Sequence, residues 1–157
     1  MHTKKGSSLI EVIVVASIFA TAFISFESTF IGLSKFHNRN TLQIKGQLLA
    51  EEGIEIIRYL RDSGWSSFSS IPLDTDYYFS LQIASWTATS TPEVVDGVFH
   101  RHFKLSEVQR SSLLPSGPIV SSGGIIDPNT RKATLDVSWL WQDATSTIHY
   151  ETYVIKL

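Results

Sequence analysis

An almost unbroken apolar run near the N-terminus constrains this chain more than any other feature. It extends from Leu9 to Phe26, and 14 of its 18 residues are apolar. As a helix the run would be about 27 Å long, close to the thickness of the hydrocarbon core of a bilayer. One of its residues is a carboxylate, Glu11, which costs roughly 2.5 kcal/mol or more near the bilayer centre and less near an edge. We therefore treat Glu11 as a functional residue in a membrane-spanning segment.

The residues before the run are few and basic, and three kinds of N-terminus fit them. A secretory signal peptide is one, because Ala20-Thr21-Ala22 offers the small residues of a cleavage site. Against it, Glu11 would lie in the first third of the apolar part of the signal. An uncleaved membrane anchor is the second, with Lys4 and Lys5 holding the N-terminus in the cytoplasm. The third is a leader that ends at Gly6 and is removed there.

The third kind carries a resemblance to a known family. The basic leader that ends at Gly6, followed by Leu9-Ile10-Glu11-Val12, resembles the start of type IV prepilins and pseudopilins. A second stretch, residues 50–62, resembles the matching helix of minor pilins of the PilV-like group. The mature chain would begin with Ser7 rather than the large apolar residue that is usual in this family. The chain is thus similar to a minor pilin or pseudopilin.

The resemblance implies a structural role and no enzyme activity. Prepilin peptidase would cleave after Gly6 and methylate the new amine of Ser7. The subunit would wait in the inner membrane, with its N-terminus in the cytoplasm and its C-terminal domain outside. It would then pass through an assembly platform into a cell-surface or periplasmic filament, a type IV pilus or a type II secretion-like fibre, together with other pilin subunits. Glu11 would accept the charged amine of a neighbouring Ser7.

A long helix is expected from Ser7 to about Asp62, because this stretch contains no proline. Beyond the apolar run its pattern becomes amphipathic, and one face carries Leu42, Leu49, Gly53, Ile56 and Leu60. Ser63-Gly64 gives a stop signal. The expected organisation is a leader (1–6), a transmembrane and filament-core half of the helix (7–33), and an extracytoplasmic domain (34–157). That domain comprises the amphipathic half-helix (34–62) and a sheet (77–157).

After the helix the apolar period changes to two, which predicts strands. The clearest alternation is Ala133, Leu135, Val137, Trp139 and Trp141. Further strands are expected around Phe79–Ile83, where Phe79, Leu81 and Ile83 alternate with polar residues and Tyr78, around Val98–Val108, with Phe99, Phe103 and Leu105 on one side, and around Ile148–Val154. Asp127–Thr130 is expected to form a turn, and Gln142–Thr145 to close a hairpin. Residues 85–92 and 111–124 are expected to be loops. The predicted fold is therefore α+β, the type IV pilin fold, with the long helix packed on a four-stranded antiparallel sheet.

The composition gives little support for a catalytic, metal-binding or nucleic-acid-binding site. The chain contains no cysteine, and its net charge of -2 offers no case for nucleic-acid binding. His100, His102 and His149 are the candidate metal ligands, but no zinc pattern completes them. Asp74 and Asp76 lack the spacing of a calcium loop. We expect no metal, no cofactor and no catalytic residue, and the alternative function is an uncleaved single-pass protein that displays a β-rich binding domain.

Overall fold

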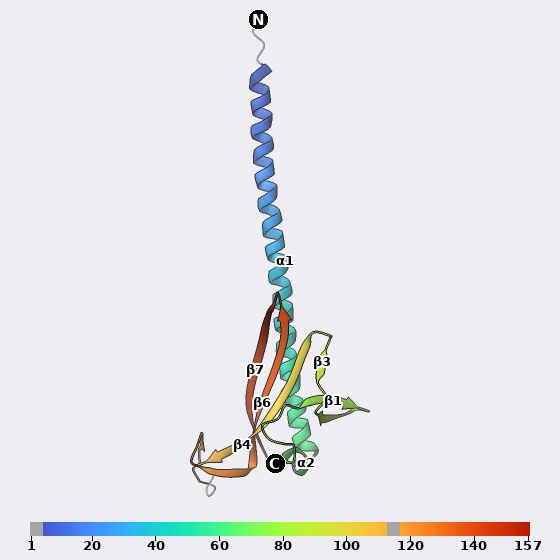
Figure 1. Ribbon diagram of the computed structural model, residues 1–157, viewed down its shortest axis with the longest axis vertical. Helices are drawn as coiled ribbons and strands as arrows, with labels where there is room; N and C mark the ends of the chain where they lie inside the picture. Colours follow the sequence, from blue (N-terminus) through green and yellow to red (C-terminus); the bar gives the residue numbers. More distant parts are fainter. Residues whose placement is uncertain (1–4, 113–116) are drawn as a thin grey trace. The chain divides into compact units, whose positions relative to one another are not determined.

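The computed structural model describes residues 5–112 and 117–157. The chain divides into two compact units, Met1–Leu42 and Gln43–Leu157. Helix α1 (Lys5–Ser63) passes through the boundary between them. In the first unit all described residues belong to α1, which continues through Gly32 without interruption (Figure 1). The helix is long and apolar enough to cross a membrane by length and composition.

The second unit is a mixed α+β domain. After the short helix α2 (Trp65–Ser69), the hairpin strands β1 (Tyr78–Gln82) and β2 (Ser85–Thr89) form a two-stranded antiparallel sheet. The remaining strands form a five-stranded antiparallel sheet of order β3-β4-β6-β7, with β5 paired to β4. These strands are β3 (Glu93–Val95), β4 (Phe99–Arg110), β5 (Ile119–Val120), β6 (Ile125–Trp141) and β7 (Ala144–Ile155). The prediction of one four-stranded sheet was wrong in its count, whereas the α+β class is confirmed.

The core of this domain lies between the sheet and the C-terminal part of α1 (Figure 1). The predicted helix face is largely confirmed, because Gly53, Ile56 and Ile57 are buried and Leu49 and Leu60 are half-buried. The sheet contributes the buried side chains of Ala133, Leu135, Val137, Trp139, Phe99, Phe103 and Leu105. The alternations predicted for β4 and β6 therefore pointed to the correct face of the sheet.

Two stretches that the sequence assigned to loops or turns belong to strands. Residues 85–92 contain β2, whose Ser85–Thr89 pairs with Tyr78–Gln82 across a two-residue turn at Ile83 and Ala84. Ile83 therefore leaves the strand, has a positive φ of 47° and is fully exposed. The expected strand therefore ends at Gln82, and of its alternating apolar side chains only Phe79 is buried, since Leu81 is 59% exposed.

The stretch Asp127–Thr130 does not reverse the chain, and the predicted turn was wrong. These residues lie inside β6, opposite a register shift between Glu107 and Gln109 of β4. The extra residues form a bulge, where the missing N–H of Pro128 removes no ladder bond. The predicted loop 111–124 contains only the short strand β5 among its described residues, while Leu113 and Leu114 lie outside them.

Candidate functional site

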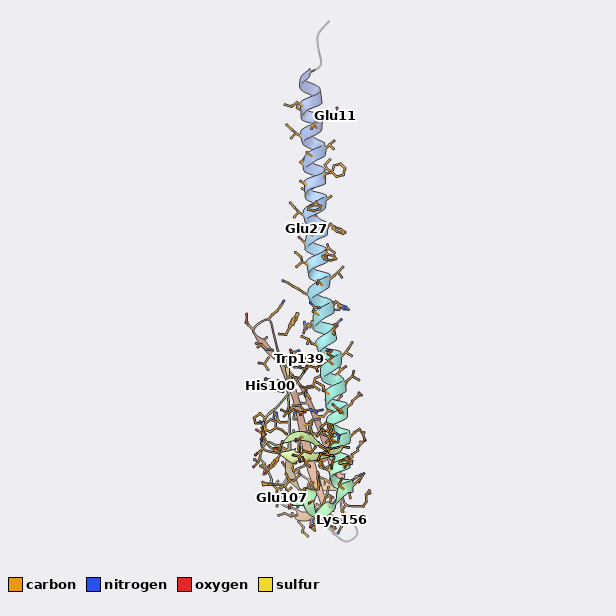
Figure 2. The ribbon with its side chains drawn as sticks, turned by 90° about the vertical axis from the view of Figure 1, so that its right-hand side faces the viewer. Glu11, Glu27, His100, Glu107, Trp139 and Lys156 are labelled. Carbon is orange, nitrogen blue, oxygen red and sulfur yellow. The ribbon has the colours of Figure 1, made fainter. Side chains whose placement is uncertain are left out.

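The N-terminal unit presents an apolar surface with two carboxylates. The large apolar side chains from Leu9 to Phe36 are 47–71% exposed. Glu11 and Glu27 are exposed on the same helix (Figure 2), and neither makes a hydrogen bond or ion pair within the described residues. Sequence reasoning identified Glu11 and missed Glu27. The signal for Glu27 was its position directly after the apolar run, inside the expected transmembrane half (7–33).

Unlike the two carboxylates, five hydroxyl groups between residues 17 and 29 have hydrogen-bond acceptors within the helix. Ser17 donates to the carbonyl oxygen of Val14 at 2.8 Å, and Thr21 donates to that of Ile18 at 2.9 Å. Ser25, Ser28 and Thr29 each donate to the carbonyl four residues earlier, at 2.9 Å. A hydroxyl satisfied by its own helix can enter an apolar environment at low cost, whereas an unpartnered carboxylate cannot.

The proposed processing site lies at the first turn of α1. The helix begins at Lys5, so Gly6 and Ser7 both have a helical backbone. Met1 to Lys4, the rest of the expected leader, lie outside the described residues. Ser7 and Glu11 are four residues apart in α1, about 6 Å along the helix axis.

The solvent-facing side of the large sheet carries a row of histidine and aspartate residues. His102 on β4, Asp136 on β6 and His149 on β7 are directly opposite one another in the register. The Nδ1 atom of His149 lies 2.7 Å from Oδ1 of Asp136, and Nε2 of His102 lies 3.7 Å from Oδ2. The hydrogen bond to Asp136 and the charge of Glu151 raise the pKa of His149, although partial burial opposes this. No group of three metal-ligating side chains forms in the described part of the chain.

The other candidate ligands are separated. His100 is exposed and lies opposite Ser138, two residues before His102 along β4. Asp76 lies 3.3 Å from Nζ of Lys104 and 3.8 Å from Nε2 of His102. Asp74 accepts a hydrogen bond of 2.7 Å from the Ser106 hydroxyl. These contacts give the carboxylates ordinary structural partners.

A buried arginine connects the helix to the sheet, and sequence reasoning missed it. Arg101 is 1% exposed and donates two hydrogen bonds to Glu93, of 3.1 and 3.0 Å. Its Nη1 atom also donates to Glu52 at 2.8 Å and to the carbonyl of Leu49 at 3.1 Å. The guanidinium lies 4.9 Å from the centre of the Phe79 ring. These contacts use four of the five N–H donors of the guanidinium, and they tie the C-terminal part of α1 to β3 and β4.

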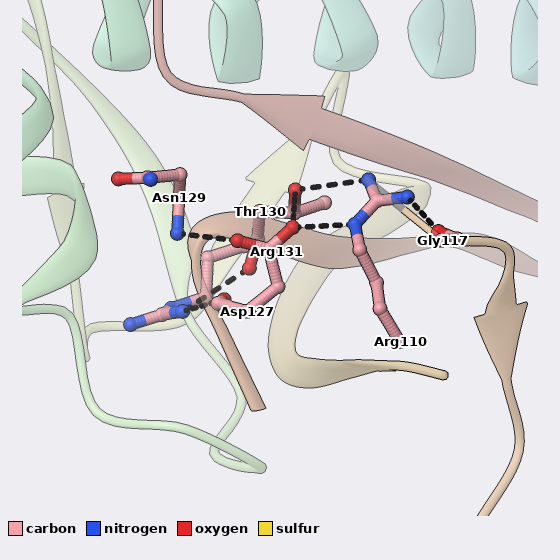
Figure 3. Close-up of polar contacts among 6 residues, drawn as sticks. All are labelled: Arg110, Gly117, Asp127, Asn129, Thr130 and Arg131. Carbon is pink, nitrogen blue, oxygen red and sulfur yellow. Dashed lines mark hydrogen bonds and ion pairs between the residues drawn. The ribbon is translucent and has the colours of Figure 1, made fainter. Parts of the chain in front are cut away.

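A second network holds the bulge in β6 (Figure 3). Asp127 accepts hydrogen bonds from Arg110 Nε at 2.6 Å, from the Thr130 hydroxyl at 2.7 Å and from the Asn129 amide at 2.9 Å. Burial raises the pKa of the Asp127 carboxyl, but these hydrogen bonds outweigh it and leave the pKa below its usual value. Arg110 also donates to the carbonyl of Gly117 at 3.0 Å and so anchors the end of the neighbouring loop.

Comparisons with known proteins give no independent assignment. No family model, no curated protein and no solved structure matches the chain.

Proposed function

We propose that this chain is a structural subunit, a minor pilin or pseudopilin, of a filament of the type IV pilus or type II secretion class. One observation carries the proposal: Glu11 is a carboxylate without a partner among the described residues, five residues after Gly6, in an apolar segment where the hydroxyls of Ser17, Thr21 and Ser25 donate to carbonyls of their own helix. The long apolar helix and the antiparallel sheets are compatible with a pilin-like fold.

In this proposal prepilin peptidase removes residues 1–6 and methylates Ser7. The mature helix is held in the inner membrane, with the domain from about residue 34 outside, until it joins other subunits. Glu11 then accepts the charged amine of a neighbouring Ser7. In a water-poor helical bundle an isolated ammonium and an isolated carboxylate are both costly, so pairing them favours one axial shift between subunits. The role is structural rather than enzymatic, and it needs no cofactor.

The N-terminal residue of the protein recovered from its host tests the processing step. Cleavage after Gly6 gives Ser7, with a mass that includes one methyl group if the amine is modified. Met1 would identify the alternative, an uncleaved single-pass protein displaying a β-rich domain. Phe23 would identify a domain released after Ala22. Gly6→Val should leave the precursor intact, and normal maturation of that variant would contradict the proposal.

Variants of Glu11 test the assembly step. Glu11→Leu removes a costly carboxylate from the bilayer, so an ordinary anchor would insert as well or better. A filament subunit would still be cleaved and held in the membrane but would be poorly incorporated. Glu11→Asp keeps the charge, loses one methylene of reach and should be intermediate. The measurement is the ratio of sheared-filament to membrane-bound protein, and equal ratios for all three chains would exclude this role for Glu11.

A further inference from the structure

Besides Glu11, three charged residues of the N-terminal unit have no side-chain partner within the described part of the chain. Glu27, Lys35 and Arg39 are exposed on α1, and no ion pair or hydrogen bond of their side chains occurs among the described residues. They flank an exposed apolar surface that other helices would have to cover in an assembly. Covering that surface would also desolvate Glu27, which is costly unless a cation lies beside it.

The partner of Glu27 has to differ from the partner of Glu11. The two carboxylates are sixteen residues apart, which places them on nearly opposite faces of the helix, about 160° apart at roughly 100° per residue. A neighbour that brings its Ser7 amine to Glu11 therefore faces away from Glu27. Each helix in a bundle has neighbours on more than one side, and contacts between identical chains in an open helical array join two different surfaces.

The cation cannot come from the same helix. Side chains three or four residues apart are neighbours on a helix, whereas Lys35 is eight residues beyond Glu27, about 12 Å along the axis. A second, parallel copy displaced by about 12 Å brings its Lys35 beside Glu27. Arg39 would require a displacement of about 18 Å.

The apolar run favours Lys35 over Arg39. The run is about 27 Å long, so a displacement of about 12 Å leaves about 15 Å of apolar helix side by side. The displacement needed for Arg39 leaves only about 9 Å. Greater overlap removes more apolar surface from lipid or water, and charge complementarity sets the same displacement.

We propose that Glu27 of one copy pairs with Lys35 of a neighbouring parallel copy, as a second assembly contact on the side of the helix opposite Glu11. This inference rests on the proposed function, because it assumes parallel copies that pack through their N-terminal helices. The neighbour is a second copy of this chain, and the contact joins one carboxylate to one ammonium.

Cysteine cross-linking tests the contact directly, because the full chain contains no cysteine. In the double variant Glu27→Cys with Lys35→Cys, the two Cα atoms of one helix are about 12 Å apart, beyond the roughly 7 Å limit for a disulfide. Any disulfide between these positions therefore joins two chains. Oxidation in filaments or membranes should give a ladder of multimers, whereas each single variant should give dimers at most. The matched control is Glu27→Cys with Arg39→Cys, which should give little ladder.

Charge exchange tests the energetics. Glu27→Lys and Lys35→Glu should each lower the sheared-to-membrane ratio several-fold, and the double exchange should restore most of it. Glu51→Lys, which changes an exposed carboxylate in the folded domain, should leave the ratio near that of the parent. The proposal is overturned if the double exchange does not restore the sheared-to-membrane ratio. It is also overturned if the Arg39 control gives an equal ladder, or if the cross-links join this chain only to a different protein. If the parent chain forms no filament, the proposed function is wrong. The Glu27–Lys35 contact is tested separately by cross-linking in membranes, where absence of the ladder would contradict it.

Discussion

Gly46 lies so close to Trp139 that a Cβ atom on the glycine would be 2.7 Å from Cζ3 of the indole. Gly53 has the same relationship to Leu135, where a Cβ atom would be 2.7 Å from Cδ2. Both glycines lie on the face of α1 that contacts the sheet. They reduce local helix propensity, but they allow the helix backbone to approach β6 closely. Their positions therefore reflect packing against the sheet.

Replacing either glycine by alanine should destabilise the domain. The change gains up to about 1 kcal/mol of helix propensity, but overpacking costs typically 1–3 kcal/mol. We expect the free energy of unfolding to fall for Gly46→Ala and Gly53→Ala. Gly32→Ala is the control, since nothing lies within 4 Å of a Cβ there, and it should be neutral or stabilising. Thermal unfolding of the full chain in detergent measures all three, and a rise in midpoint for Gly46→Ala would contradict the close packing.

Trp139 should contribute strongly to the core. It is 5% exposed, and its ring centre lies 5.6 Å from that of Phe99. Trp139→Ala should cost about 3–5 kcal/mol of unfolding free energy, because it leaves a large cavity. Leu140→Ala, one residue along on the exposed face, should cost far less. Equal melting of the two variants would mean that Trp139 does not face the helix.

The network around Asp127 should stabilise the bulge. Arg110→Met keeps the aliphatic stem but removes the donors to Asp127 and Gly117, so we expect a loss of about 1–3 kcal/mol. Arg58→Met removes only an exposed pair with Glu55 and should cost less than about 1 kcal/mol. Because the folded pKa of Asp127 is lowered, its contribution is present above about pH 3.9 and is lost as the pH falls through the folded pKa. An acid titration of stability in which Arg110→Met matched the parent would contradict this assignment.

His149 should make stability depend on pH in the opposite direction. Its pKa is raised in the folded state by the hydrogen bond to Asp136. Protonated His149 therefore contributes stability that is complete below about pH 6.5 and is lost as the pH rises through the folded pKa. The difference in melting temperature between the parent and His149→Gln should be largest at low pH and shrink towards pH 8. A difference in melting temperature that stayed the same from pH 5 to pH 8 would contradict this role of His149.

The sequence determined the elements that depend on local pattern. The apolar run and the absence of proline predicted α1, which ends at Ser63 before Gly64, close to the expected position. The hairpin predicted at Gln142–Thr145 is present, but its turn is only two residues long: Gln142 and Asp143 have positive φ angles of 46° and 63°, and Ala144 begins β7. The alternation from Ala133 to Trp139 gave the buried face of β6. The position of Glu11 in the apolar run needed no structure either.

The tertiary structure decided which strands pair and which charges are buried. Ser85–Thr89 has the composition of a loop, yet it pairs with β1 because a neighbouring strand satisfies its backbone. Asp127–Thr130 has the composition of a turn, yet Arg110, distant in sequence, holds it as a bulge. Arg101 occupies an apolar-face position between Phe99 and Phe103, and its burial depends on acceptors from distant parts of the chain: Glu93, Glu52 and the Leu49 carbonyl. Local pattern reports the period and the ends of an element, whereas partners far apart in sequence set its pairing and the burial of its charges.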